Sequence, residues 1–195
     1  IKRNGKNYNV TGLEGITGSG KTLVYFERIK EIISKDLQAL ILLPEIALTN
    51  QFSRRFKDFF GSEPAIWHSE TSKKNKSIIW NGITEGKIKI VVGARSSLFL
   101  PFKNLGIIIV DEEHDVSYKQ DEGISYNARD MAITRASLEN IPINLVTSIP
   151  SIETYNNIVN KKYNITKLKK RYQEASMPNI EIIDSHSQSL DKDSW

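Results

Sequence analysis

The sequence predicts an α/β fold in which helices cover both faces of a mostly parallel sheet. Short apolar runs alternate along the chain with stretches of helical periodicity. The apolar runs are nearly continuous rather than alternating, as in strands that are buried on both faces. A glycine-rich segment lies between the first predicted strand and the first predicted helix, where a parallel sheet places its tight turns.

The predicted strands are bounded by glycine, proline or polar residues. They are Asn9–Glu14, Gln38–Leu43, Ala65–Trp67, Ile88–Val92, Leu105–Val110 and Ile143–Val146. The first of them is unusually polar for a strand inside a sheet. A further short strand is possible at Asn179–Ile183.

Helical periodicity separates these strands. The predicted helices are Thr22–Ser34, Ile46–Phe60, Lys73–Thr84 and Asn127–Glu139. The first carries one apolar stripe, formed by Leu23, Phe26, Ile29, Ile32 and Ile33. The second places four aromatic residues at core-facing positions, Phe52, Phe56, Phe59 and Phe60.

The composition is that of a globular domain of ordinary size. The chain has 195 residues, 39% hydrophobic and 26% charged, which excludes a disordered or collagenous chain. It contains no cysteine, which excludes a disulfide framework within these residues and fits a reducing cytoplasm. No apolar run approaches the roughly 20 residues that cross a membrane. The net charge of +4 permits nucleic-acid binding without establishing it.

The composition changes after about Ser151. We expect one domain over residues 1–160 and, over 161–195, a basic and then polar extension that leads toward another part of the protein. The first residue is isoleucine, so we expect the chain to be a piece of a longer one. The lysine-rich run 161–170 is interpreted as a solvated face.

Gly15–Thr22 reads G-I-T-G-S-G-K-T and matches the pattern G-x-x-x-x-G-K-[ST] in full. Such glycines let backbone N–H groups point at phosphate oxygens, next to the positive end of a helix dipole. Lys21 can reach the β- and γ-phosphates, and the Thr22 hydroxyl can join the shell of a Mg²⁺ ion. The alternative is a plain glycine-rich turn before a helix. The expected nucleotide-binding residues are Gly15, Thr17, Gly18, Ser19, Gly20, Lys21 and Thr22.

A second motif, the acidic sequence D-E-E-H, begins at Asp111, where a buried strand ends. Carboxyl ends of parallel strands are where such sheets bind ligands. Asp111 can hold Mg²⁺ together with Thr22, and Glu112 can orient or deprotonate the attacking water. An acidic loop that merely caps a strand is the alternative. ATP hydrolysis is favoured because the two motifs complete one Mg²⁺–phosphate site, with Lys21, Asp111 and Glu112 as catalytic residues.

Together with the glycine-rich motif, D-E-E-H resembles the motor of DEAH-type superfamily 2 helicases. Further segments follow in order. They are P-E-I-A-L-T at Pro44–Thr49, H-S at His68–Ser69, G-A-R-S-S-L-F at Gly93–Phe99, V-S-Y-K-Q at Val116–Gln120 and Y-N-A-R-D at Tyr126–Asp130. This series resembles the primosomal protein N′ family of bacterial replication-restart helicases, over about Tyr8 to Asp184.

The resemblance implies an ATP-dependent 3′-to-5′ DNA helicase that acts at stalled forks and in primosome assembly. The chain would be its first RecA-like lobe, using ATP and Mg²⁺. The family's DNA-binding N-terminal region, second lobe and zinc-binding cysteine module are absent from this segment. The implied partners are forked or single-stranded DNA, the second lobe and other replication-restart proteins, with no membrane.

Several residues fit a DNA-facing role. Small or cationic donors such as Thr49, Arg95 and Ser96 can hold backbone phosphates. Aromatic, cationic and amide side chains interleave in the loop after D-E-E-H, as in surfaces that stack on bases. In the family, this loop couples DNA contact to ATP hydrolysis. The expected coupling residues are His114, Tyr118, Lys119, Gln120 and Tyr126. Alternatively, the two tyrosines pack under the loop and Arg95 is a solvated cation.

Three positions depart from the family pattern. Leu23 stands where glutamate is common, and Ala94 and Ser97 replace threonine and alanine in the arginine-containing box. In the S-A-T-P-S box, Ile149 replaces a threonine that links nucleotide state to lobe movement. We therefore expect these departures to impair the coupling of ATP hydrolysis to lobe movement more than they impair nucleotide binding. A non-catalytic binding module and an unrelated P-loop phosphotransferase remain alternatives.

Overall fold

The computed structural model describes residues 8–44, 47, 49–121 and 123–171. Seven strands form one sheet in the order β3-β4-β2-β5-β8-β1-β9. All six pairings between neighbouring strands are parallel. The strands are β1 (Val10–Gly15), β2 (Gln38–Leu42), β3 (Ala65–Trp67), β4 (Ile90–Gly93), β5 (Leu105–Asp111), β8 (Ile143–Thr147) and β9 (Asn164–Leu168).

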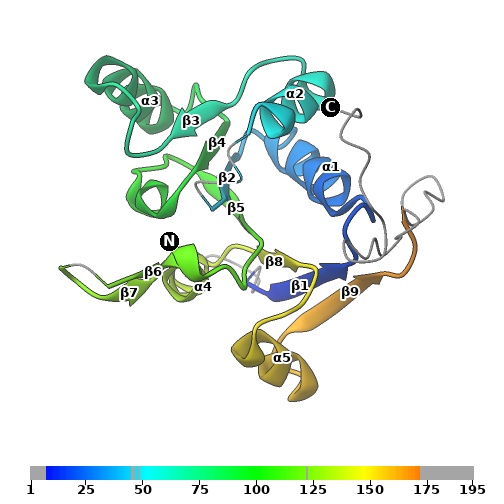
Figure 1. The fold of residues 1–195 in the computed structure, drawn as a ribbon. Helices are drawn as coiled ribbons and strands as arrows, with labels where there is room; N and C mark the ends of the chain where they lie inside the picture. The colour runs from blue at the N-terminus through cyan, green and yellow to red at the C-terminus, as the bar shows by residue number, and fades with distance from the viewer. Residues whose placement is uncertain (1–7, 45–46, 48, 122, 172–195) are drawn as a thin grey trace, which may run out of the picture.

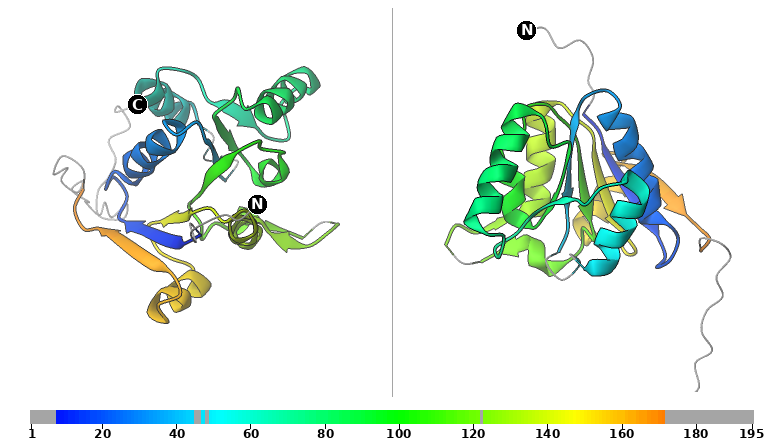
Figure 2. Two further views of the ribbon diagram at one scale, coloured as in Figure 1. Left: turned by 180° about the vertical axis from the view of Figure 1, so that it is seen from behind. Right: turned by 90° about the horizontal axis from the view of Figure 1, so that it is seen from above.

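Five helices connect these strands and cover both faces of the sheet (Figures 1 and 2). They are α1 (Lys21–Ile33), α2 (Asn50–Phe60), α3 (Lys73–Glu85), α4 (Ala128–Glu139) and α5 (Ile152–Val159). Helices α1 and α2 pack on one face, and α3 and α4 pack on the other. The predicted fold class, a RecA-like α/β domain, is confirmed. None of the helices in the described part of the chain is both long and apolar enough to cross a membrane.

Strands β2 and β5 form the centre of the core because they have neighbours on both sides and a helix layer on each face. Every residue of both strands is buried. Successive side chains of β5 alternate between the two cores: Ile107 and Ile109 face α1 and α2, whereas Ile108 and Val110 face α3 and α4. This burial on both faces is why these strands read as continuous apolar runs.

Strand β1 tolerates polar residues because of its neighbours. It pairs with β8 on one side and with β9 on the other. The Glu14 carboxylate forms an ion pair with the Lys167 ammonium of β9 at 2.9 Å. Strand β9 was not predicted, and it extends the sheet to Leu168 within the basic run 161–170. Its edge position accounts for its exposed, lysine-bearing sequence.

Helices α1 and α2 differ in detail from the predictions. Helix α2 begins at Asn50 rather than Ile46, because Thr49 has an extended backbone and its hydroxyl accepts a hydrogen bond from the Phe52 N–H as an N-cap. In α1, Leu23 lies at the edge of the buried stripe with 36% exposure, whereas Tyr25 is fully buried. Helix α5 was not predicted. The possible strand at Asn179–Ile183 lies outside the described residues.

A two-stranded antiparallel hairpin, β6 (Lys119–Gln120) and β7 (Tyr126–Asn127), projects beside α4 (Figure 1). It leads directly into α4, whose N-cap is the Asn127 side chain. Two short 3₁₀ helices, η2 (Arg95–Phe99) and η3 (Val116–Tyr118), follow β4 and β5. The carboxyl ends of the parallel strands and these short elements form the edge of the sheet that carries the predicted motifs.

Candidate nucleotide and coupling site

The glycine-rich loop runs from the end of β1 to the start of α1. Gly18 and Gly20 have φ angles of +79° and +86°, in the left-handed region that side chains with a Cβ rarely adopt. A Cβ on Gly15 would lie 2.4 Å from the Ser19 Oγ, so the close turn also requires glycine there. Gly20 is the N-cap of α1, and the first N–H groups of that helix therefore face the loop.

The polar groups of the loop fit a polyphosphate. The Lys21 ammonium lies over the loop and donates a hydrogen bond to the Gly15 carbonyl oxygen at 2.7 Å. The Ser19 hydroxyl is buried and has no hydrogen-bond partner in the described part of the chain. A buried hydroxyl without a partner is costly in a protein interior. A phosphate held by helix N–H groups would give Ser19 an acceptor and the Lys21 ammonium an anion.

Asp111 ends β5 and faces the same cavity as the loop. The cavity has a volume of about 430 Å³. It is lined by Thr17, Gly18, Ser19, Gly20, Lys21, Thr22, Leu23, Arg55, Asp111 and Glu112. The two motifs are 90 residues apart in the sequence, and the sheet order brings them together because only β8 separates β5 from β1.

The Asp111 carboxylate is held by two donors. The Tyr25 hydroxyl donates to Oδ2 and the Glu112 backbone N–H donates to Oδ1, both at 3.0 Å. Burial raises the pKa of Asp111 to about 6, and the neighbouring charge of Glu112 adds to the increase. The hydrogen bonds and the charge of Lys21 oppose this rise. A bound divalent cation would relieve the same burial cost, so the carboxylate suits a metal ligand.

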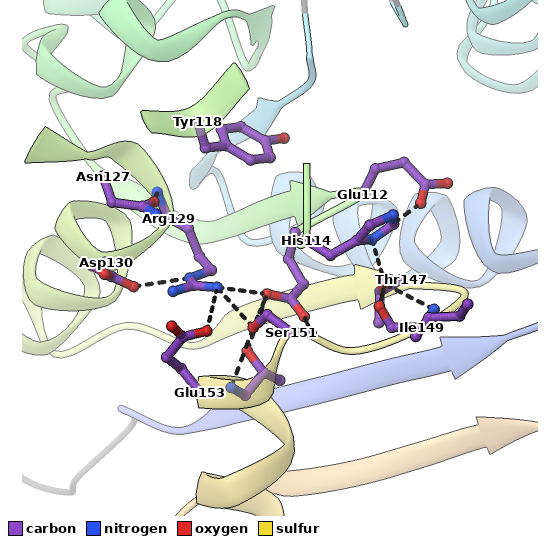
Figure 3. Close-up of polar contacts among 12 residues, drawn as sticks. Glu112, His114, Tyr118, Asn127, Arg129, Asp130, Thr147, Ile149, Ser151 and Glu153 are labelled. Atoms are coloured by element: carbon purple, nitrogen blue, oxygen red, sulfur yellow. Dashed lines mark hydrogen bonds and ion pairs between the residues drawn. The ribbon is translucent and has the colours of Figure 1, made fainter. Parts of the chain in front are cut away.

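Glu112 and His114 connect the acidic motif to the end of β8. Glu112 has a φ angle of +48°, which turns the chain sharply after β5. The His114 Nδ1 lies 3.7 Å from a Glu112 carboxylate oxygen and 2.8 Å from the Thr147 hydroxyl (Figure 3). The Thr147 hydroxyl also donates to the Ile149 carbonyl oxygen at 2.6 Å and accepts from the Ile149 N–H at 3.1 Å.

A buried polar cluster holds Glu113, the third residue of the motif. One carboxylate oxygen accepts from the Ser151 N–H at 2.8 Å, and the other from the Ser151 and Thr154 hydroxyls at 3.0 Å. The Arg129 guanidinium of α4 lies 3.3 Å from Glu113 and also contacts Ser151, Asp130 and Glu153 (Figure 3). This cluster ties β5, α4 and α5 together.

The predicted DNA-facing residues lie along the same edge of the molecule but differ in exposure. Ser96 is exposed, and Arg95 donates from Nη1 to the Lys119 carbonyl oxygen at 2.7 Å. That bond links η2 to the hairpin. The Lys119 ammonium is exposed and pairs with Asp121 at 3.1 Å. Gln120 and Tyr126 are half-buried on the facing strands of the hairpin.

The two predicted loop tyrosines have different environments. Tyr118 is 1% exposed, and its hydroxyl hydrogen-bonds to the Asp111 and Leu42 carbonyl oxygens at 2.6 and 3.0 Å. Its ring is therefore packed beneath the loop in this structure and cannot stack on a base. Tyr126 packs edge-to-face on Phe99, with ring centroids 5.7 Å apart. Phe99 itself is 56% exposed.

Sequence reasoning missed four residues of this region. Tyr25, Glu113, Arg129 and Arg55 were not among the predicted site residues. Tyr25 follows the glycine-rich motif by three residues, but only contacts in the fold direct its hydroxyl to Asp111. Glu113 is part of D-E-E-H, and the Ser151 and Thr154 that bind it lie in a stretch for which no helix was predicted.

Comparison with known proteins points to one family. The model for the DEAD/DEAH box helicase matches residues 4–158. The replication restart protein PriA of Rickettsia conorii is 52% identical over 185 residues, and PriA of Bacillus subtilis is 42% identical over 172. These matches cover 95% and 88% of this chain, but the chain spans only 28% and 21% of the relatives' lengths.

Solved structures share the fold at low sequence identity. The helicase domain of Hef from Pyrococcus furiosus has a TM-score of 0.61 at 19% identity, covering 87% of this chain and 37% of that one. RecG bound to a three-way DNA junction has a TM-score of 0.58 at 22% identity, covering 82% of this chain and 20% of that one.

Proposed function

Because this chain belongs to the DEAD/DEAH box helicase family, we propose that it is the first motor lobe of a replication-restart DNA helicase that hydrolyses ATP. The similarity to PriA over 95% of the chain supports the restart assignment. Translocation in the 3′-to-5′ direction, action on forked or single-stranded DNA and assembly with other primosome proteins belong to the same proposal. So does a cytoplasmic location.

The shared cavity of Lys21 and Asp111 is the observation that carries the proposal. In it, the N–H groups of the loop and of α1 bind the phosphates, and Lys21 neutralises the transferred group. Thr22 and Asp111 hold Mg²⁺, which supplies charge neutralisation at the reacting phosphate when it is bound. Glu112 orients the attacking water and accepts its proton.

Contacts at the end of β5 support a route by which DNA binding is coupled to the ATP site. Glu112 lies beside His114, and His114 hydrogen-bonds to Thr147 at the head of the T-S-I-P-S segment. On the other side, Tyr118 joins the Asp111 carbonyl to the hairpin loop. DNA that binds Arg95, Ser96 and the hairpin would displace these contacts. In this role Tyr118 transmits movement from beneath the loop, and Tyr126 is nearer the DNA.

We assign residues 1–160 to this lobe, together with β9, which pairs with β1 in its sheet, and the rest of 161–195 to a segment that leads toward a second lobe. The chain spans 28% of the length of the Rickettsia relative, which leaves ample length in such a protein for further lobes. Residues of a second lobe would complete the ATP site, since arginines supplied to the transition state contribute roughly 10³- to 10⁵-fold in rate.

Nucleotide binding by variants of two residues tests the proposed function. Lys21→Ala should abolish binding of Mg·ATP, because the ammonium is lost from the phosphate loop. Glu112→Gln should keep binding and remove residual hydrolysis, because only the proton acceptor is lost. Calorimetry and a phosphate-release assay measure the two effects separately.

Two results would contradict this proposal. Salt-sensitive DNA binding that is indifferent to ATP would favour the non-catalytic module. Transfer of phosphate to a small alcohol or nucleotide, with no effect of DNA, would favour the phosphotransferase.

A further inference from the structure

Arg55 of α2 is a cation in the nucleotide cavity with no assigned role. Its side chain lines the cavity together with Lys21, Asp111 and Glu112. Its side chain is exposed, and within residues 8–44, 47, 49–121 and 123–171 it makes no hydrogen bond or ion pair. An arginine with five free donors beside a phosphate-binding loop is a ready anion ligand.

Aromatic packing fixes the position of Arg55. Phe56, the next residue, is 2% exposed, and its ring lies 5.7 Å from the Phe26 ring of α1. Phe52 and Phe60 also pack on Phe26, at 5.9 and 5.1 Å between ring centroids. Helix α2 is therefore held against α1 along most of its length. Arg55 directly precedes Phe56 and lines the same cavity as the first residues of α1.

The sheet order determines from which side Arg55 approaches. Helix α2 follows β2, and β2 is the neighbour of β5 on the side away from β1. Arg55 and the acidic pair Asp111 and Glu112 thus follow neighbouring strands, β2 and β5, whereas the glycine-rich loop follows β1. In the proposed function, the terminal phosphate and its metal ion lie at the Asp111 end of the cavity.

The charge balance of the cavity is compatible with a second cation beside the nucleotide. Its charged lining consists of two cations, Lys21 and Arg55, and two carboxylates, Asp111 and Glu112. With Mg²⁺ on Asp111, the carboxylates are compensated by the metal ion. Apart from Arg55, Lys21 is then the only cation of the described lining that faces the triphosphate. A guanidinium forms shorter and stronger hydrogen bonds to phosphate oxygens than a neutral donor does.

We propose that Arg55 binds the terminal phosphate of the nucleotide, so that this lobe distinguishes ATP from ADP before any other lobe closes on it. The proposal rests on the proposed function, because it takes ATP as the ligand of the cavity. It makes Arg55 a nucleotide-binding residue of this lobe, in contrast to arginines that a second lobe would supply. ADP lacks the group that Arg55 would contact.

Calorimetric titration of the full chain with Mg²⁺ and either a non-hydrolysable ATP analogue or ADP tests the proposal. Arg55→Gln should weaken binding of the ATP analogue by about tenfold or more, because one charge-assisted contact is lost. Binding of ADP should change by less than about twofold. Arg55→Lys should fall between the wild type and Arg55→Gln, because it keeps the charge without the planar fork.

Arg54→Gln is the matched control. Arg54 is the adjacent arginine of α2, which is also exposed, and it does not line the cavity. Equal behaviour of the Arg55→Gln and Arg54→Gln variants, or an equal loss of both nucleotides in Arg55→Gln, would overturn the proposal. If the Arg55 proposal fails in this way but Lys21→Ala weakens nucleotide binding, the proposed function is retained. Wild-type protein that binds neither nucleotide, or Lys21→Ala protein that binds as the wild type does, overturns both.

Discussion

At the scale of single residues, Asp111 is the most informative side chain because its position serves a ligand rather than the fold. It is 9% exposed and accepts two hydrogen bonds, yet burial raises its pKa from the ordinary 3.8 to about 6. A carboxyl with a raised pKa costs the folded state free energy once it ionises. Its cost is therefore absent below about pH 4 and complete above about pH 6.

Asp111→Asn should accordingly stabilise the ligand-free protein at pH 7.5. From the pKa of about 6 against the ordinary 3.8, the gain is about 3 kcal/mol in the free energy of unfolding. At pH 4 the folded protein carries a neutral side chain at this position in both cases, so most of the gain should disappear. Urea unfolding of both proteins at the two pH values measures it.

Asp115→Asn is a control in which the pKa of the carboxyl is shifted in the opposite direction. Hydrogen bonds from Ser117 lower the pKa of Asp115, so its charge stabilises the fold at neutral pH, and this contribution is lost as pH falls. Its replacement should destabilise the protein more at pH 7.5 than at pH 4. A benefit of Asp111→Asn that is the same at both pH values would contradict the assigned cause.

At the scale of elements, the Glu113 cluster joins three parts of the fold that are distant in sequence. Its carboxylate has no exposed surface, and the Arg129 side chain is 7% exposed. Neither group can exchange its partner for water without moving α4 or α5. Because Ser151 caps α5 and also binds Glu113, the acidic motif and the T-S-I-P-S segment are held in one arrangement.

Glu113→Ala should therefore be severely destabilising. It removes the buried partner of the Arg129 guanidinium and leaves only the exposed carboxylates of Asp130 and Glu153, which costs about 3–5 kcal/mol in the free energy of unfolding. Adding Arg129→Met should recover a large part of the loss, because the buried charge is then removed. Chemical denaturation of the single and double variants measures both values.

Glu153→Ala is the matched control for this cluster. Glu153 also pairs with Arg129, at 3.6 Å, but its side chain is 69% exposed. Its loss should cost less than about 1 kcal/mol, since exposed ion pairs contribute little. Similar losses for Glu113→Ala and Glu153→Ala would show that the buried pair is not the source of the stability.

At the scale of the whole molecule, the seven-stranded sheet carries the predicted site at the carboxyl edge of its strands. Apolar side chains remain exposed next to that edge. Ile149 and Ile152 are 72% and 84% exposed at the start of α5, and Val116 is 87% exposed beside the hairpin. These side chains border the proposed site in a chain that spans 28% of the length of the Rickettsia relative.

The chain alone should hydrolyse ATP very slowly and should not unwind DNA. The full-length protein should turn over roughly 10³- to 10⁵-fold faster, if its second lobe supplies arginines to the transition state. Measurement of ATP hydrolysis with and without single-stranded DNA, for the chain and for the full-length protein, tests this. Fast, DNA-stimulated turnover by the chain alone would contradict it.

Much of the fold was predictable because its strands are buried on both faces. The runs at Gln38–Leu43 and Leu105–Val110 match β2 and β5 to within one residue. Helix α5 and strand β9 escaped prediction because they lie at the rim, where packing does not demand an apolar pattern. The hairpin has strands of two residues, which are too short for any periodicity.

The order of residues along the chain by itself determined the phosphate loop, the acidic motif and the strands that carry them, because turn geometry and strand burial are local demands on residue type. Only the tertiary structure decided which side chains meet there. Tyr25, Arg55 and Arg129 reach their places through the packing of helices on the sheet. A side chain's partners across the fold depend on the strand order, which no local pattern encodes.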